Sequence, residues 1–162
     1  NIMNIPDLRN KKLEVTDIDE IKKFLNRATT IRVSFNSGEG YPITLPLSYG
    51  YEFTDDDKLI FYFHGGFNGV RYNKISEDGR VCIETDVFEK YHQAPPSATA
   101  DYTSLVAFGD AVEVKDEEKE HAMREILKHC GYGYIDKKKK LFSVTSLFKV
   151  EVEKYTCKCK ID

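Results

Sequence analysis

A glycine-rich segment, IFYFHGGFNGVRYNKI at residues 60–75, contains residue types suited to binding an anion. A hydrophobic strand pattern ends there and a helical pattern begins. The residues of interest are His64, Gly65, Asn68, Gly69 and Arg71. Free N–H groups at a helix start attract anions, and glycine lets the backbone approach a ligand closely. A basic residue in the first turn is unfavourable to the helix dipole unless an anion lies beside it. We therefore interpret the segment as a phosphate-binding loop; the alternative is that Arg71 points to solvent.

The loop differs from the common nucleotide-binding motifs. Neither the triphosphate loop GxxxxGK[ST] nor the dinucleotide motif GxGxxG occurs in the chain. A single phosphate, held by a short loop and one or two basic side chains, suits the segment better. The sequence therefore favours a mononucleotide over a triphosphate or a dinucleotide.

Length and composition predict one domain, residues 1–162, with residues 1–15 as an N-terminal arm. The net charge of -3 argues against a general nucleic-acid binder. No apolar run approaches the roughly 20 residues of a membrane span, and the N-terminal residues lack the apolar core of a signal peptide. We expect a cytoplasmic protein with neither nucleic-acid nor membrane partners. A basic run, residues 137–140, is expected in a solvated loop.

The four cysteines, Cys82, Cys130, Cys157 and Cys159, predict no metal site. No pair has CxxC spacing. Cys157 and Cys159 would face the same way on a strand, but no second Cys or His pair completes a ligand set. We expect unpaired thiols.

The clearest periodic pattern is YPITLPLSYGYEF at residues 41–53, where every odd position is apolar or aromatic. Alternation over this length predicts one long strand with a single buried face. Because proline cannot donate to a ladder, Pro42 and Pro46 place the strand at an edge or a bulge. Backbone groups around position 46 should then be free to bond a ligand.

The other elements favour a mainly β fold, a six-stranded antiparallel barrel with helices outside. Further strands are predicted at residues 30–35, 59–63, 80–88, 103–114 and 146–155, and helices at 16–28, 68–76 and 116–130. Residues 89–101, with Pro95 and Pro96, are expected to be irregular. A hairpin turn is predicted at residues 36–40, a bulge at Gly109 and a helix C-cap at Gly131.

Four segments in order resemble the flavin-binding split-barrel family typified by pyridoxamine 5'-phosphate oxidase. They are GYPITLPLSYGYE, LIFYFHGGFNGVRYNKI, RVCIETD and DYTSLVAFGDAVEV, and the resemblance runs from about residue 16 to residue 130. The chain is more closely similar to the branch of the Nim 5-nitroimidazole resistance proteins, in which GYPxxxPLSY, xYFHxxxxGxK and SVxxFGxA occur in this order. Arg71 stands where that pattern has lysine, which keeps the charge.

The resemblance implies a homodimer of six-stranded barrels with FMN bound at the subunit interface. Residues 44–49 would line the isoalloxazine ring with backbone groups, and the glycine-rich loop would hold the phosphate. Ser104 and Val106 would approach from a neighbouring strand or from the partner chain. The implied cofactor-binding residues are Thr44, Leu45, Pro46, Leu47, Ser48, Tyr49, His64, Gly65, Asn68, Gly69, Arg71, Ser104 and Val106.

The activity that the resemblance implies is an FMN-dependent oxidoreductase. It would reduce a small electrophile such as a nitroaromatic, and a small-molecule electron donor would then reduce the flavin again. His64 is the implied catalytic residue, unless it only bonds phosphate or backbone. Pyridoxamine phosphate oxidation is not expected, because the tail KYTCKCKID lacks the arginine and histidine that grip that substrate's phosphate. The alternative is a non-catalytic flavin or haem binder or sensor of the same superfamily.

Overall fold

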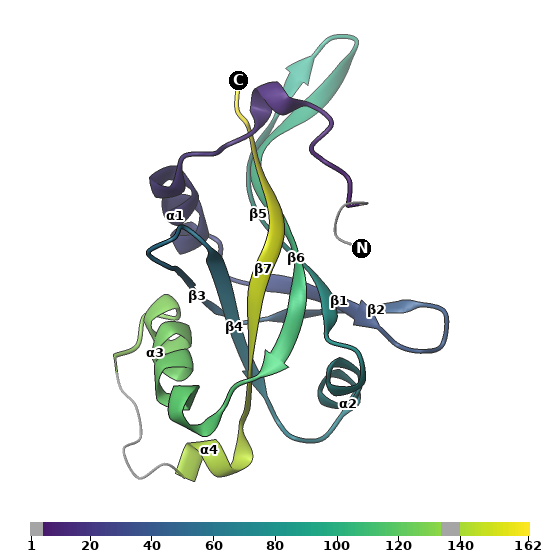
Figure 1. The fold of residues 1–162 in the computed structure, drawn as a ribbon. Coiled ribbons are helices and arrows are strands. Elements are labelled where there is room, and N and C mark those ends of the chain that lie inside the picture. The colour runs from purple at the N-terminus through teal and green to yellow at the C-terminus, as the bar shows by residue number, and fades with distance from the viewer. Residues whose placement is uncertain (1–4, 134–139) are drawn as a thin grey trace.

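The computed structural model describes residues 5–133 and 140–162, and these form one antiparallel β-sheet with helices packed around it (Figure 1). The sheet has seven strands in the order β2-β1-β5-β6-β7-β4-β3. The strands are β1 (Ile31–Asn36), β2 (Pro42–Leu47), β3 (Gly50–Phe53), β4 (Leu59–Gly65), β5 (Arg80–Ala94), β6 (Ser97–Glu113) and β7 (Ser146–Lys160). The helices are α1 (Ile18–Arg27), α2 (Val70–Glu77), α3 (Lys119–His129) and α4 (Lys140–Val144), with 3-10 turns at Lys11–Leu13 and Asp116–Glu118.

The sheet curls until its two edges meet. β2 and β3 lie at opposite edges of the strand order, yet only Ser48 and Tyr49 separate them along the chain. A flat sheet could not be joined in this way, so its edges come together as in a split barrel. The prediction of one strand over residues 41–53 was therefore wrong in detail. The strand breaks at residues 48–49, which gives seven strands instead of six.

Pro46 lies opposite Arg32 in the ladder of β2 with β1, so the break is not at the proline. The predicted edge position was correct, because β1 is the only strand that pairs with β2 in the described sheet. A proline is tolerated there because its missing donor need not serve a second neighbour. Within residues 5–133 and 140–162, the outer edge of β2 has no strand partner.

The core lies between α1 and the inner face of the curled sheet. Asp17 caps α1 by accepting a hydrogen bond from the Glu20 amide at 3.0 Å. The apolar stripe of α1 buries Ile21, Phe24 and Leu25, and the odd residues of β1 bury Ile31, Val33 and Phe35. These side chains show the helical and period-two spacing predicted from the sequence.

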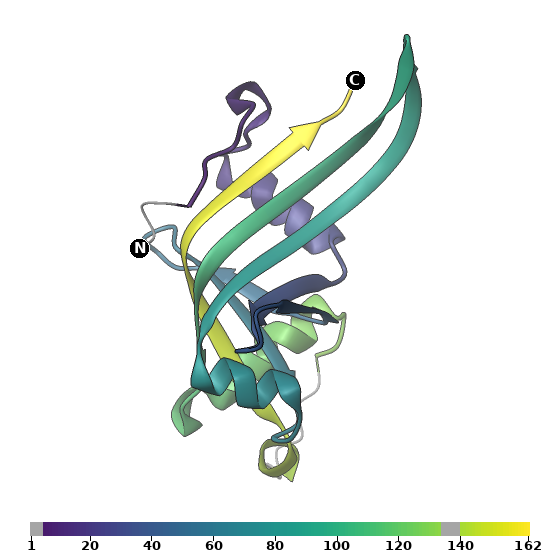
Figure 2. The same ribbon diagram turned by 90° about the vertical axis from the view of Figure 1, so that its right-hand side faces the viewer.

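β5 and β6 form a long hairpin that projects from the barrel beyond its other strands (Figure 2). Its ladder runs on to the pair of Ala94 and Ser97, so the prediction of an irregular stretch over residues 89–101 was wrong. The polar and exposed residues near the tip show no period-two pattern, because both faces of the hairpin meet solvent there.

Several local predictions were confirmed. A turn with Gly38 and Gly40 at positive φ joins β1 to β2, and the register of β6 with β7 shifts at Gly109. Gly131 has φ 85 after α3, where the Tyr132 amide donates to the Leu127 carbonyl at 2.8 Å. Most of the predicted basic loop lies outside the described residues. Among the helices that the structure describes, none has the length and apolar character needed to cross a bilayer.

Candidate functional site

The glycine-rich loop joins the end of β4 to the start of α2. Ser146, which is buried at the start of β7, donates its hydroxyl toward the carbonyls of Gly65 and Gly66 at 3.1 and 3.0 Å. Gly69 is the N-cap of α2 with φ 111, and no side chain caps the helix. An added Cβ at Gly69 would meet nothing within 4 Å. No side chain in the described residues caps the first amides of α2, which leaves them available to an anion.

Arg71 lies in the first turn of α2 and folds back over Gly65. A Cβ built on Gly65 would lie only 1.3 Å from Nη2 of Arg71. The side chain is partly buried, and burial lowers its pKa from the usual value. Within residues 5–133 and 140–162, Arg71 has no hydrogen bond or ion pair. A partly desolvated guanidinium without a carboxylate partner is a ready site for an anionic ligand.

His64 precedes Gly65 on β4 and is exposed. Side chains alternate across a strand, so His64 points to the face opposite the one on which Arg71 covers Gly65. Partial burial of the ring, and then the charge of Arg71, lower the pKa of His64 below its usual value. The imidazole is therefore neutral at pH 7 and can donate or accept one hydrogen bond.

Residues 44–49 follow the outer edge of β2 and end at the junction with β3. The ladder of β3 with β4 ends at the pair of Gly50 and Tyr62, and we call the opening beyond this pair the seam of the barrel. Ser48 and His64 lie on the two sides of the seam, each two residues beyond the pair. Thr44 and Ser34 share a hydrogen bond of 2.8 Å between their hydroxyls. The side chains of Leu45 and Leu47 pack against the core. The structure thus brings the end of β2 beside the glycine loop.

Tyr49 belongs to the core rather than to an open site. Its side chain is fully buried, and its hydroxyl lies 2.7 Å from the carbonyls of both Leu25 and Ala28 at the end of α1. Burial raises the pKa of this phenol. Only the backbone of Tyr49 is therefore left for a ligand. This is the role that the family resemblance implied for residues 44–49.

Ser104 and Val106 lie on the outer face of β6, at a different level of the sheet from the loop. Val106 is opposite Thr156 on β7, whereas His64 is opposite Leu147. These two positions of β7 are nine residues apart, or roughly 30 Å along an extended strand. One chain does not bring Ser104 and Val106 to the glycine loop.

Val106 instead shares a row with Glu84, Arg32 and Pro46 across four neighbouring strands. Arg32 reaches Glu84 at 3.6 Å and Asp86 at 3.7 Å, which are long contacts for ion pairs. Burial, and then the neighbouring Asp86, raise the pKa of Glu84 to about 7, and Arg32 offsets part of this. Glu84 and Asp86 are only two residues apart, but their contact with Arg32 could not be predicted from the sequence, because Arg32 lies on another strand about 50 residues earlier.

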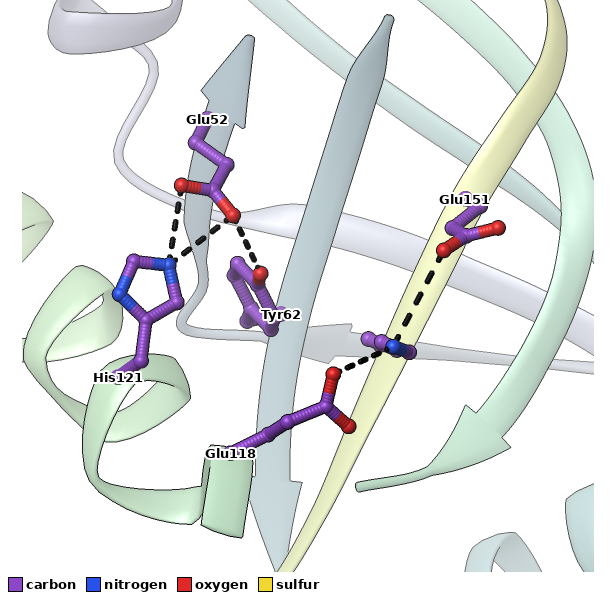
Figure 3. A network of polar contacts seen from close by, with 6 residues as sticks. Glu52, Tyr62, Glu118, His121 and Glu151 are labelled. Carbon is purple, nitrogen blue, oxygen red and sulfur yellow. Dashed lines mark hydrogen bonds and ion pairs between the residues drawn. The ribbon is translucent and has the colours of Figure 1, made fainter. Parts of the chain in front are cut away.

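Two polar features outside the predicted site come from strand and helix packing. Figure 3 shows the Glu52 carboxylate accepting hydrogen bonds from Tyr62 at 2.6 Å and from His121 at 3.0 Å. Nearby, Lys149 lies between Glu118 and Glu151. A pocket of about 510 Å³ opens between α1, β3 and α3, lined by Lys22, Phe53 and His129 among others. Neither these two networks nor the pocket includes a residue of the glycine loop.

An antiparallel sheet whose edges meet at a two-residue junction, with helices outside it, defines a split-barrel protein. The family model described as pyridoxamine 5'-phosphate oxidase matches residues 17–158, and the chain belongs to this family. Proteins with curated descriptions include no significant match to the sequence.

Solved structures support the same fold. A candidate 5-nitroimidazole antibiotic resistance protein from Bacteroides thetaiotaomicron VPI-5482 is 25% identical with a TM-score of 0.77, over 90% of this chain and 85% of that one. The flavocytochrome Anf3 from Azotobacter vinelandii is 17% identical with a TM-score of 0.72, over 96% and 73%. An FAD- and haem-binding protein from Mycobacterium smegmatis is 12% identical with a TM-score of 0.71, over 93% and 74%.

Proposed function

We propose that the chain is an FMN-binding flavoprotein that acts as an oxidoreductase on small electrophiles. The observation that carries the proposal is the guanidinium of Arg71, held over Gly65 at the uncapped start of α2 with no partner in the described residues. A charged donor beside free helix amides suits the terminal phosphate of a mononucleotide. Asn68 and Gly69 would complete this cradle.

The residues present fit the rest of the cofactor. The outer edge of β2 offers backbone groups without a strand partner, and it ends beside the loop at Ser48. Thr44, Pro46 and Ser48 have exposed side chains that leave this edge accessible. The backbone of residues 44–49 would fix the isoalloxazine ring. When bound, a flavin supplies hydride or electron transfer, and the chain supplies orientation and polar contacts.

The proposed assembly is a homodimer with FMN between the subunits. Ser104 and Val106 lie at another level of the sheet from the loop, so they would contact the cofactor held by the partner subunit. The row of Pro46, Arg32, Glu84 and Val106 would then lie close to the interface.

His64 is proposed to act on the electron acceptor. It is exposed and uncharged at pH 7, and it lies at the seam beside Ser48. A neutral imidazole can hold a polar acceptor by donating one hydrogen bond, and it can relay a proton to it if its other nitrogen takes up a proton from solvent. A nitroaromatic is the proposed acceptor class, because the chain is similar to a candidate 5-nitroimidazole resistance protein. Reduced nicotinamide is the proposed donor class.

A second candidate function is flavin or haem binding without turnover. The likeness to a flavocytochrome and to an FAD- and haem-binding protein favours it. Both candidates need a bound cofactor and differ only in catalysis, so one set of measurements distinguishes them.

The experiment is to release and identify the bound cofactor by mass spectrometry, and then to follow its redox chemistry without oxygen. We expect FMN, reduction by NADH or NADPH, and reoxidation by a nitroaromatic compound. The His64→Gln variant should keep its FMN content and lose turnover. FMN without turnover would support the binding protein. A preparation that takes up neither flavin nor haem would contradict both candidates.

A further inference from the structure

The outer end of the β5–β6 hairpin, close to its turn, contains a histidine between two carboxylates. Nδ1 of His92 lies 3.2 Å from Oδ1 of Asp101, and Nε2 lies 3.1 Å from Oδ2 of Asp162. The Asp162 amide also donates to Oδ1 of Asp101 at 3.3 Å. The glycine loop lies at the other end of the molecule from this hairpin (Figures 1 and 2).

A change of register in the hairpin places His92 toward Asp101. Up to Thr85 the odd residues of β5 are buried, and the register then shifts between Phe88 and Lys90. Beyond the shift, His92 is the one residue of β5 that is partly buried. Lys90 pairs with Asp101 and His92 pairs with Thr99. His92 and Asp101 are thus diagonal neighbours on one face, within reach of each other's side chains.

Asp101 is a buried carboxylate with an unsatisfied oxygen. Its side chain is 1% exposed, and Oδ2 has no hydrogen-bond partner. Nδ1 of His92 is also buried without a hydrogen bond, although it lies close to Oδ1. A buried charge without full compensation is costly, so this pair calls for a further positive ligand.

The hydrogen bonds that the His92 imidazole can make give a second reason to expect a positive ligand here. A neutral imidazole has one N–H, and the contact of Nε2 with Asp162 has the geometry of a hydrogen bond. Nδ1 then directs a lone pair toward the Asp101 carboxylate. Two lone pairs at 3.2 Å repel each other unless a cation lies between or beside them. A proton on Nδ1 would need hydrogen-bond alignment, which this contact does not have.

We propose that Nδ1 of His92 and the Asp101 carboxylate hold a divalent transition-metal cation such as Zn²⁺, with Asp162 at the opposite ring nitrogen. The nitrogen and oxygen atoms of this group lie close enough together to surround one ion, within 4.8 Å of one another. Tetrahedral bonds of 2.0–2.1 Å separate two ligands by about 3.3 Å, close to the distance between Nδ1 and Oδ1. Asp162, hydrogen-bonded to the opposite nitrogen, orients the ring as second carboxylates do around zinc-bound histidines.

A second group with the same residue types provides the control. Glu52, His121 and Glu125 also lie within reach of one cation. His121 is more exposed than His92, at 53% against 24%, and Glu52 already accepts hydrogen bonds from Tyr62 and His121. No buried orphan oxygen is recorded for this group in the described residues. We therefore expect no tight binding there.

The test is calorimetric titration of untagged, chelator-treated protein with Zn²⁺, without any flavin measurement. The wild type should bind one ion per chain. His92→Gln and Asp101→Asn should abolish this binding, Asp162→Asn should weaken it by about 10–100-fold, and His121→Gln should leave it unchanged. No uptake by the wild type, or equal uptake by the His92 and Asp101 variants, would overturn the proposal.

A spectrum of the wild type loaded with Co²⁺ gives a second measurement that does not depend on the variants folding. Nitrogen and oxygen ligands should give d–d bands without thiolate charge transfer. A thiolate band would assign the ion to a cysteine of the chain and overturn the proposal. Neither result depends on the proposed flavin chemistry.

Discussion

The guanidinium of Arg71 occupies the place where a side chain at position 65 would begin. The Cβ of any other residue there would lie 1.3 Å from Nη2 of Arg71. Gly65 is thus required for the position of Arg71 rather than for backbone conformation, because it has no positive φ. This relationship couples the strand end to the first turn of α2.

Gly65→Ala should weaken FMN binding while leaving the protein stable. The displaced group is the end of a flexible side chain, so the fold can accommodate the methyl group, but the guanidinium moves. We expect an affinity loss of roughly 1.5–3 kcal/mol, the range for a charged hydrogen bond. Gly66→Ala is the matched control, since a Cβ there meets only the Asn68 amide at 3.9 Å. Equal FMN affinity of the two variants would count against the proposed site.

Tyr49→Phe should destabilise the protein by roughly 1–3 kcal/mol, because it removes a buried hydroxyl that donates toward the Leu25 and Ala28 carbonyls at the end of α1. Denaturant unfolding would measure the change. Tyr51→Phe removes an exposed hydroxyl that bonds Asn26 and the Lys22 carbonyl, and should cost less. If both variants lose the same stability, burial of the Tyr49 hydroxyl is not the cause.

Glu84→Gln should change how stability depends on pH. The pKa of Glu84 is raised to about 7 in the folded protein, so the folded state holds its proton between the unfolded value near 4.5 and 7. Its contribution to stability is present below pH 4.5 and is lost as pH rises to 7. The variant should therefore gain stability relative to the wild type at pH 8 compared with pH 5. Melting temperatures of the wild type and the variant, measured from pH 5 to pH 8, test this prediction. Parallel curves of melting temperature against pH for the two proteins would contradict it.

Gly50→Ala should be strongly destabilising, because its Cβ would meet the backbone of Glu125 and Ile126 at 2.4 Å. Backbone cannot yield as a side-chain end can, so β3 and α3 must separate. We expect a loss of at least about 1–3 kcal/mol, the range for overpacking. Gly133→Ala has open space and should be neutral in the same unfolding experiment.

Local patterns predicted most of the fold. The spacing of Ile31, Val33 and Phe35 predicted β1, and Gly109 marked the bulge of β6. The outer half of the hairpin was missed because exposed residues carry no hydrophobic period. The break at residues 48–49 was missed because Tyr49 continues the alternation while the chain crosses from one sheet edge to the other.

The residues of the glycine loop could be selected from the sequence, because they are adjacent and their types suit phosphate. Their relation to Ser104 and Val106 could not, since it depends on strand register over the whole of β7. The grouping of His92, Asp101 and Asp162 could not be predicted either. Asp162 is 70 residues from His92 and 61 from Asp101, and only the pairing of strands brings it to them.

The central claim is that Arg71 binds the phosphate of FMN, and comparing FMN with riboflavin tests it most directly. Riboflavin has the same ring without the phosphate. In calorimetric titrations the wild type should bind FMN more tightly than riboflavin by roughly 1.5–3 kcal/mol. Arg71→Ala should remove this preference, and Arg80→Ala, an equal charge change at a residue bound to Asp78, should keep it. An undiminished preference in Arg71→Ala would contradict the account.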